Sequence, residues 1–305
     1  LCIQAMLALS GAKKIIMGRG AHLSAHNAMA LLDIIPIWFY PDGKAGPGLP
    51  GRYDPSILYN LLLQNPDAGA VYITSPDYYG CLSDIPALAQ VCRQRGVQLL
   101  VDNAHGSHLP FCGEIHPIAA GADWCCDSAH KTLPVLTGGA MLHTRHGGRA
   151  LEVKAAMELF GSTSPSFLTL LSLDQCADYL KERGKVDFLP LCAKLGKLKE
   201  AAALGGFTLP EGPCDPIRLT VGCDAPDDEL SVYFQNRGIS CEYLRGGWAV
   251  FLLSPSNTEE ELERLKNALL SWNGPKGLPP AGFMHRPRLI LSPRQAVFST
   301  KEALD

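Results

Sequence analysis

Short apolar segments alternate with helical patterns through the first half of the chain. Six of these segments carry the pattern of buried strands: Lys14–Met17, Ile34–Phe39, Ala70–Thr74, Val97–Val101, Ala122–Cys126 and Ala140–His143. Alternation of this kind is typical of a mainly parallel sheet with helices on both faces. Between two of the segments a crossover helix is predicted to start at Asp84, a capping residue, and to end at Gly96. The sequence therefore predicts an α/β fold.

The pattern changes after Gly161. A long helical region is expected from about Phe167 to about Ala203, with an interruption at Pro190. The segment 216–272 then gives a strand, a helix, one or two strands and a last helix that begins with a capping box at Thr258. We predict four parts: a large domain (1–165), linking helices (166–204), a small α+β domain (205–273) and a tail (274–305) that is extended or docked on something outside the chain.

Two further segments carry expectations. Residues 41–53 are rich in proline and glycine, which predicts a surface loop that could lie over a site. The chain begins at Leu1 rather than at a methionine, and its first residues already have an amphipathic helical pattern. We therefore expect a fragment whose tail leads into a further C-terminal part.

Composition narrows the choice of partners. A net charge of −3 over 305 residues gives no field that would attract nucleic acid. The longest apolar stretch, 28–40, is interrupted by Asp33 and Pro36 and is too short to span a membrane. Small molecules are the expected partners. The eleven scattered cysteines form no zinc motif, which favours free thiols in a reducing cytoplasm.

Two aspects of the sequence suggest catalytic chemistry. Asp102 stands at the carboxyl end of a predicted buried strand, where open α/β sheets bind ligands, although a capping or turn aspartate is the simpler interpretation of this residue alone. Lys131 follows the next strand, beside Ser128 and His130. A lysine in a partly dry pocket has a lowered pKa and can form a Schiff base. Asp102 and Lys131 together fit the two anchors that pyridoxal 5′-phosphate (PLP) needs, and Ser128 and His130 are placed to bind its phosphate.

These residues resemble the fold-type-I PLP-dependent enzymes, and within them the ornithine/lysine/arginine decarboxylases. The matching stretches are Ser75–Gly80, Val101–Gly106, Ser128–Leu133, Ser162–Ser166 and Leu291–Arg294. The resemblance implies a PLP-binding α/β domain, decarboxylation of arginine, lysine or ornithine to the amine used in polyamine biosynthesis, and a homodimer or higher homo-oligomer.

The resemblance also implies roles for single residues. Lys131 would be the Schiff-base lysine, Asp102 the partner of the ring nitrogen and His22 a ring stacked on the cofactor with a further catalytic role. The other expected cofactor contacts are Ala104 under the ring, His105, Ser24, Ser128, His130, and the loop Ser162, Thr163 and Ser164, which often approaches from a neighbouring subunit. Glu242 is a candidate for facing a cationic substrate, while a solvated strand residue is its simpler interpretation.

Some observations leave alternatives open. The family's phosphate loop does not precede the first helix, and Gly138 stands where relatives usually carry glutamine. A fold-type-I aminotransferase, another PLP lyase, or a non-catalytic homologue that dimerises would share most of these features. Two histidine pairs, 22 with 26 and 105 with 108, have no carboxylate motif beside them, so we expect no metal site.

Overall fold

The computed structural model describes residues 1–162, 164–281 and 289–300. Its strands are β1 (Lys14–Gly18), β2 (Ile35–Phe39), β3 (Ala70–Thr74), β4 (Gln98–Asp102), β5 (Trp124–Asp127), β6 (Met141–Thr144), β7 (Arg218–Gly222), β8 (Tyr243–Arg245) and β9 (Trp248–Leu252). Each of the six predicted strands of the first half is therefore confirmed, with ends shifted by at most two residues. The fold class is α/β, as expected.

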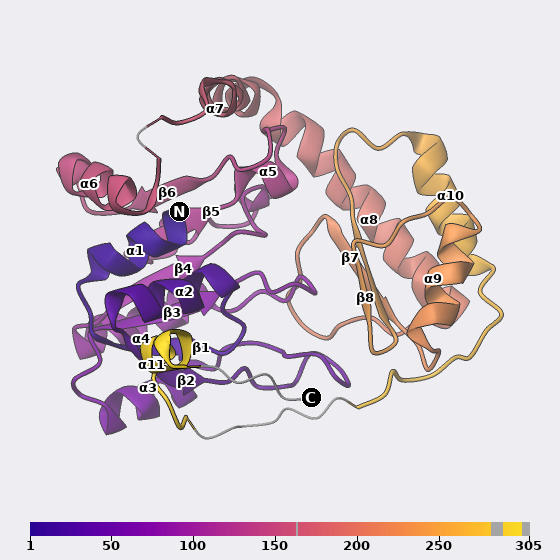
Figure 1. Cartoon of the computed structure of the whole chain (residues 1–305). Helices are drawn as coiled ribbons and strands as arrows, with labels where there is room; N and C mark the ends of the chain where they lie inside the picture. Colours follow the sequence, from indigo (N-terminus) through magenta and orange to yellow (C-terminus); the bar gives the residue numbers. More distant parts are fainter. Residues whose placement is uncertain (163, 282–288, 301–305) are drawn as a thin grey trace.

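The helices are α1 (Cys2–Ser10), α2 (Leu23–Leu32), α3 (Pro55–Gln64), α4 (Ile85–Arg95), η1 (Leu109–Phe111), α5 (Ala129–Thr132), α6 (Ala150–Phe160), α7 (Phe167–Tyr179), η2 (Leu180–Gly184), α8 (Lys185–Gly205), α9 (Asp227–Gln235), α10 (Glu259–Leu270) and α11 (Pro293–Phe298). Helices cover the six strands of the first half of the chain from both sides, whereas α8, α9 and α10 lie on one side of β7, β8 and β9 (Figure 1). Among the described residues, none of these helices has the length and apolarity that crossing a membrane requires.

The large sheet has the strand order β2-β1-β3-β4-β5-β6, with only β6 antiparallel to its neighbour. Successive residues of a strand face opposite sides. On β1, Ile15 and Met17 pack with α1 and α2, while Ile16 packs with α3 and α4. Because both faces are covered, the strands are apolar throughout, which explains why runs rather than alternation marked them in the sequence.

A second sheet, β7-β9-β8, is antiparallel and packs on α8, α9 and α10. The expected order of strand, helix, two strands and helix is confirmed. The capping box is present too: Thr258 accepts from the backbone of Glu261, whose carboxylate accepts from the backbone of Thr258. Leu262, Leu265 and Leu269 form the buried stripe of this helix.

The interruption of the long helical region is not at Pro190. This proline lies inside α8, and the irregular turn is the π-helical segment η2, which ends just before α8 begins. A proline cannot donate to the carbonyl four residues earlier, at Val186. The helical turns nevertheless continue from η2 into α8, because a wide π turn does not end a helix.

Two predictions about loops need correction. The segment 41–53 is not simply a surface loop, because Ala45 and Leu49 are buried against Trp248 of β9. Trp248 also donates from Nε1 to the carbonyl of Pro47 at 2.8 Å, so the loop joins the two sheets. In the tail, α11 docks on α2 of the same chain, where Arg294 donates to the carbonyls that end α2.

Helix α4 gives a direct test of the local sequence argument. The Asp84 carboxylate accepts from the backbone N–H of Ala87 at 2.9 Å, and Gly96 ends the helix in the left-handed conformation. Replacing Asp84 with alanine should lower the free energy of unfolding by about 1 kcal/mol, because the helix loses its N-cap. Asp84→Asn keeps a capping oxygen and should stay close to wild type. Equal losses in the two variants, measured by urea denaturation, would show that the cap is unimportant.

Candidate active site

A cavity of about 590 Å³ lies at the carboxyl edge of the large sheet. It is lined by residues that directly follow or end parallel strands: Gly20 after β1, Thr74 at the end of β3, Asp102 at the end of β4 and Asp127 at the end of β5. This is the edge at which open α/β sheets bind ligands, and the volume suits a small molecule.

Asp102 is 1% exposed, and its carboxylate is held by two donors. The Tyr72 hydroxyl donates to Oδ2 at 2.9 Å, and the backbone N–H of Ala104 donates to Oδ1 at 3.1 Å. Burial nevertheless raises the pKa of Asp102 above its ordinary value. A cationic N–H placed against this carboxylate would offset the cost of its burial. The protonated ring nitrogen of PLP is such a group, so Asp102 fits the cofactor.

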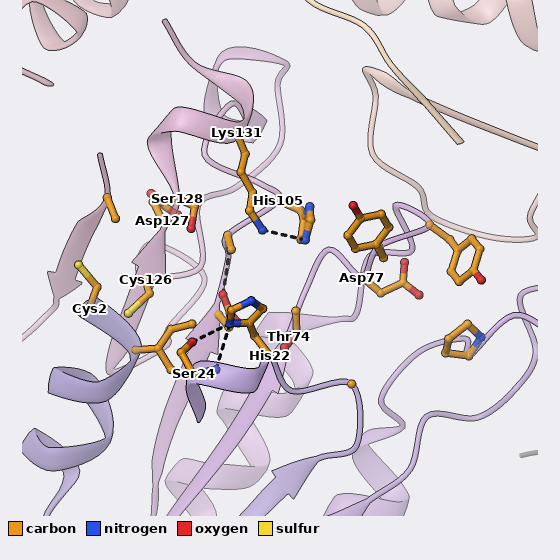
Figure 2. Close-up of a pocket in the computed structure, with 18 of the residues that line it drawn as sticks. Cys2, His22, Ser24, Thr74, Asp77, His105, Cys126, Asp127, Ser128 and Lys131 are labelled. Carbon is orange, nitrogen blue, oxygen red and sulfur yellow. Dashed lines mark hydrogen bonds between the residues drawn. The ribbon is translucent and has the colours of Figure 1, made fainter. Parts of the chain in front are cut away.

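Lys131 extends from α5 into the same cavity (Figure 2). Its Nζ lies 3.3 Å from His105 Nε2. Burial lowers the pKa of Lys131, and the charge of Arg218 acts in the same direction, while Asp102 and Glu242 oppose the shift. A lysine amine in this state is a better nucleophile toward an aldehyde than a solvated one.

Most of the other residues predicted to contact the cofactor lie together at this cavity. Ala104, His105, His22, Ser24, Ser128 and His130 all line the cavity. His22 is the N-cap of α2: its Nδ1 accepts from the backbone N–H of Ser24 and contacts the Ser24 hydroxyl at 2.7 Å. His130 donates from Nδ1 to the carbonyl of Gly139 at 2.8 Å. Their roles toward a cofactor stay predictions.

Among the described residues predicted for the site, Ser162, Ser164 and Glu242 do not line this cavity. Ser162 and Ser164 are exposed and lie beside α6, where the Ser162 hydroxyl accepts from the Ser164 backbone. Thr163 lies outside the described residues. Glu242 does not line the cavity either, but its carboxylate accepts from the hydroxyl of Tyr78, which does.

Sequence reasoning missed several residues of the site. Tyr53 belongs to the predicted loop 41–53, which does border the cavity, through Pro41, Pro50 and Gly51 as well. Tyr78 and Tyr79 also contribute to the cavity wall, and so does Asp77, whose pKa burial raises to about 6. The matching stretch Ser75–Gly80 pointed toward three of them without giving a role. Arg218, which contacts His105 from β7, gave no sequence signal because the two residues are 113 positions apart.

In each histidine pair considered for metal binding, one histidine contacts a different residue. The His26 ring packs against Trp38, and His108 bonds Asp215 rather than joining His105. A different group, His116 with Cys125 and Asp127, brings its ligand atoms within 4.8 Å of one another. Since His116 Nδ1 accepts from the backbone of Ile118, its Nε2 carries the proton and donates it to Asp127. This arrangement favours a hydrogen-bonded cluster.

The fold defines the structural class of the protein. The chain has the architecture of the fold-type-I PLP-dependent enzymes, and it superposes on the lysine decarboxylase LdcF of Francisella novicida with a TM-score of 0.74. That match has 18% sequence identity and covers 88% of this chain and 46% of the other. At this identity the likeness shows the fold alone.

The family follows from sequence. Residues 2–196 match the family model for the Orn/Lys/Arg decarboxylase major domain, and the chain belongs to this family. It is 31% identical over 219 residues to the uncharacterized protein YaaO of Bacillus subtilis, covering 68% of this chain and 45% of that protein. It is also 30% identical over 177 residues to an arginine decarboxylase of Halalkalibacterium halodurans, covering 57% and 36% respectively. The chain thus spans less than half the length of these curated relatives.

The Tyr72 contact with Asp102 makes a prediction about stability. Tyr72→Phe leaves one oxygen of a buried carboxylate unpaired and should cost about 1.5–3 kcal/mol at neutral pH, as expected for a hydrogen bond to a charged group. The loss of stability should increase as pH rises above 3.8, the ordinary pKa of an aspartate. Without the Tyr72 hydrogen bond, Asp102 ionises less readily in the folded state, while it ionises normally in the unfolded state.

Tyr53→Phe is the matched control for this measurement. The Tyr53 hydroxyl accepts from the backbone of Gly20 at 3.3 Å and has no hydrogen bond to a charged group within the described part of the chain, so the loss of stability should be smaller and independent of pH between about 4 and about 8. Urea denaturation of both variants across this range compares them. Parallel losses would mean that Tyr72 does not hold an ionised Asp102.

Proposed function

We propose that the full-length protein binds PLP and decarboxylates a basic amino acid to the corresponding amine. The observation that carries the proposal is the convergence of a buried carboxylate, Asp102, and a desolvated amine, Lys131, on one cavity. Membership of the Orn/Lys/Arg decarboxylase family and similarity to an arginine decarboxylase support the choice of reaction.

Each cofactor contact has a candidate in the chain. Lys131 would hold the aldehyde carbon as a Schiff base, Asp102 would keep the ring nitrogen protonated, and Ala104 and His22 would lie against the two ring faces. Ser128, His130 and Ser24 have polar groups at the cavity wall for the phosphate. When bound, PLP supplies an electron sink for the bond broken at the substrate's Cα.

The protein's own groups then handle the proton. Decarboxylation replaces the carboxylate at Cα with a proton, and Lys131 and His22 are the candidate donors because both line the cavity. His22 is fixed in direction by its contacts with Ser24, while Lys131 would be available as a proton donor once its amine is released from the cofactor. Tyr78 and Tyr79 form the cavity wall on the side of the three-stranded sheet and would limit the entry of water there.

The proposed substrates are arginine, lysine and ornithine. A distal cation needs an anionic or acceptor group near the mouth of the cavity, and Glu242 next to Tyr78 is the candidate within this chain. Since Glu242 is exposed here, its contribution depends on whether a substrate or a second subunit covers it.

We also propose a cytoplasmic homodimer. All eleven cysteines lie among the described residues and are free thiols, a state that a reducing cytoplasm maintains. Several large apolar side chains on α6 and α7 are largely exposed: Leu151, Leu159, Phe167 and Leu168. An apolar face of this kind suits a second copy, and it lies next to Ser162 and Ser164, the residues predicted to approach a neighbouring site.

The Schiff base has a chemical test. Incubation with PLP, reduction with borohydride and peptide mapping should find the cofactor on Lys131, because its amine is partly desolvated and faces the cavity. Lys131→Ala should show no such adduct while keeping its fold by circular dichroism. Lys14 is a useful internal comparison, since it is paired with Asp67 on the surface. Reduction that labels another lysine in place of Lys131 would contradict the assignment.

The reaction is tested by incubating the full-length protein and PLP with carboxyl-labelled arginine, lysine, ornithine and a neutral amino acid. We expect labelled CO₂ and the matching amine from a basic substrate only. Asp102→Asn should keep the adduct on Lys131 and lose turnover by orders of magnitude, because a neutral partner no longer holds the ring nitrogen protonated. Keto-acid formation without CO₂ would point to an aminotransferase, and an absence of any turnover to a non-catalytic homologue.

A further inference from the structure

A line of polar side chains connects the cavity with the three-stranded sheet. It begins at Lys131, whose Nζ lies 3.3 Å from His105 Nε2, and continues from His105 Nδ1 to Arg218 NH2, also at 3.3 Å. Arg218 then pairs with Asp215, which accepts from His108 Nε2 at 2.8 Å. Apart from Lys131, every member of this line is at least 92% buried, since the relative exposures range from 0% to 8%.

Two of the three guanidinium nitrogens of Arg218 form hydrogen bonds with protein groups. Arg218 is 2% exposed, and its NH1 donates to the carbonyl of Tyr78 at 2.9 Å. Its Nε lies 3.5 Å from a carboxylate oxygen of Asp215, and its NH2 faces His105. Burial alone would raise the pKa of Asp215, but the charges of His108 and Arg218 hold this pKa below its ordinary value. Nε lies beside Asp215 without a hydrogen bond and NH1 is bound to Tyr78, so Arg218 acts on the cavity through the contact of NH2 with His105.

The contact with Arg218 determines which nitrogen of His105 carries the proton. A guanidinium has donors only and stays charged in proteins, so the His105 Nδ1 that faces it must be the acceptor. In the neutral ring the proton therefore lies on Nε2, which points toward Lys131. A second proton on the ring is disfavoured, because burial, and after it the charge of Arg218, lower the pKa of His105 to about 3.

This tautomer has a consequence for the lysine. An Nε2–H group donates, so the Lys131 amine that faces it at 3.3 Å is best placed when it accepts, which only the neutral amine can do. The other charged groups that act on Lys131 are Asp102 from β4 and Glu242 near β8, which favour the ammonium, and Arg218 from β7, which opposes it. Among the described residues, His22 is a further titratable group near this line, and it lowers the pKa of both Asp102 and His105.

We propose that Arg218 is a positioning residue that fixes His105 as the Nε2–H tautomer and thereby keeps the free Lys131 amine neutral. A neutral amine is the form that attacks a carbonyl or displaces a product, so the three-stranded sheet controls the reactivity of the catalytic lysine through one side chain. The assignment of Lys131 as catalytic rests on the proposed function, whereas the Arg218, His105 and Lys131 arrangement does not depend on it.

The first experiment uses the wild-type chain without PLP or amino acid. Nitrogen NMR of protein labelled in its histidine rings distinguishes protonated from unprotonated ring nitrogens, and loss of a signal in His105→Gln assigns it. We expect His105 to carry its proton on Nε2 from about pH 6 to about pH 9, since its pKa lies below this range. A proton on Nδ1, or a ring that titrates in this range, overturns the proposal.

The second experiment removes Arg218. The double variant Arg218→Met with Asp215→Asn avoids leaving a buried carboxylate unpaired, which alone would cost about 3–5 kcal/mol. Without the guanidinium, His105 Nε2 can become an acceptor and Lys131 can donate to it as an ammonium. The pKa of Lys131, read from the pH dependence of its acetylation by mass spectrometry, should rise by about one unit or more.

Arg52→Met is the matched control. Arg52 also ties the two parts of the chain together, by donating to the carbonyls of Glu211 and Pro213, but it does not contact His105. It should leave the His105 tautomer and the Lys131 pKa unchanged. An equal rise in both variants, or no rise in either, would show that Arg218 has a structural role only. Both readouts are taken without PLP, so a failure of the decarboxylase proposal would leave them unaffected.

Discussion

The site depends on one constraint, which is that the parallel strands β1, β3, β4 and β5 all end at the same edge of a sheet covered on both faces. Their last residues and the loops that follow must meet there, because strand pairing fixes their register. Thr74 and Asp102 are register partners, and Asp102 is opposite Cys126, one residue before Asp127. Residues that are tens of positions apart in sequence thus become neighbours without any further device.

Much of this arrangement can be predicted from the sequence. The apolar runs indicate the strands because both faces are buried, and the same runs place Asp102 at the carboxyl end of one strand and Lys131 just beyond another. The capping residues Asp84 and Thr258 were equally recognisable, because a cap is a local interaction between residues three positions apart. The predictions that succeeded rest either on periodicity or on short-range hydrogen bonding.

The predictions that failed depend on contacts between distant segments. Proline and glycine in residues 41–53 indicate a loop. Its burial, however, depends on Trp248, about 200 positions later, and a contact over that distance cannot be predicted from the local sequence. The docking of α11 similarly depends on the carbonyls at the end of α2. Arg218 had no motif at all. For these residues the sequence specifies the side chain, while the partner is set by how the two sheets meet.

The contact between the sheets also contains a buried ion pair, Arg218 with Asp215. A buried ion pair such as Arg218 with Asp215 is weak evidence for stability, because desolvation offsets most of the attraction. The surrounding backbone nevertheless accommodates this pair closely. Gly80 has a φ of +86°, and a Cβ at this position would lie 2.9 Å from Arg218 Cδ, so the chain leaves just the space that the arginine occupies. Thr220 and Arg218 bond the carbonyls of Tyr79 and Tyr78 directly before that glycine. A charged side chain that contributes little net stability, and for which the backbone makes room, is best explained by the contact of its NH2 group with the imidazole that faces the cavity.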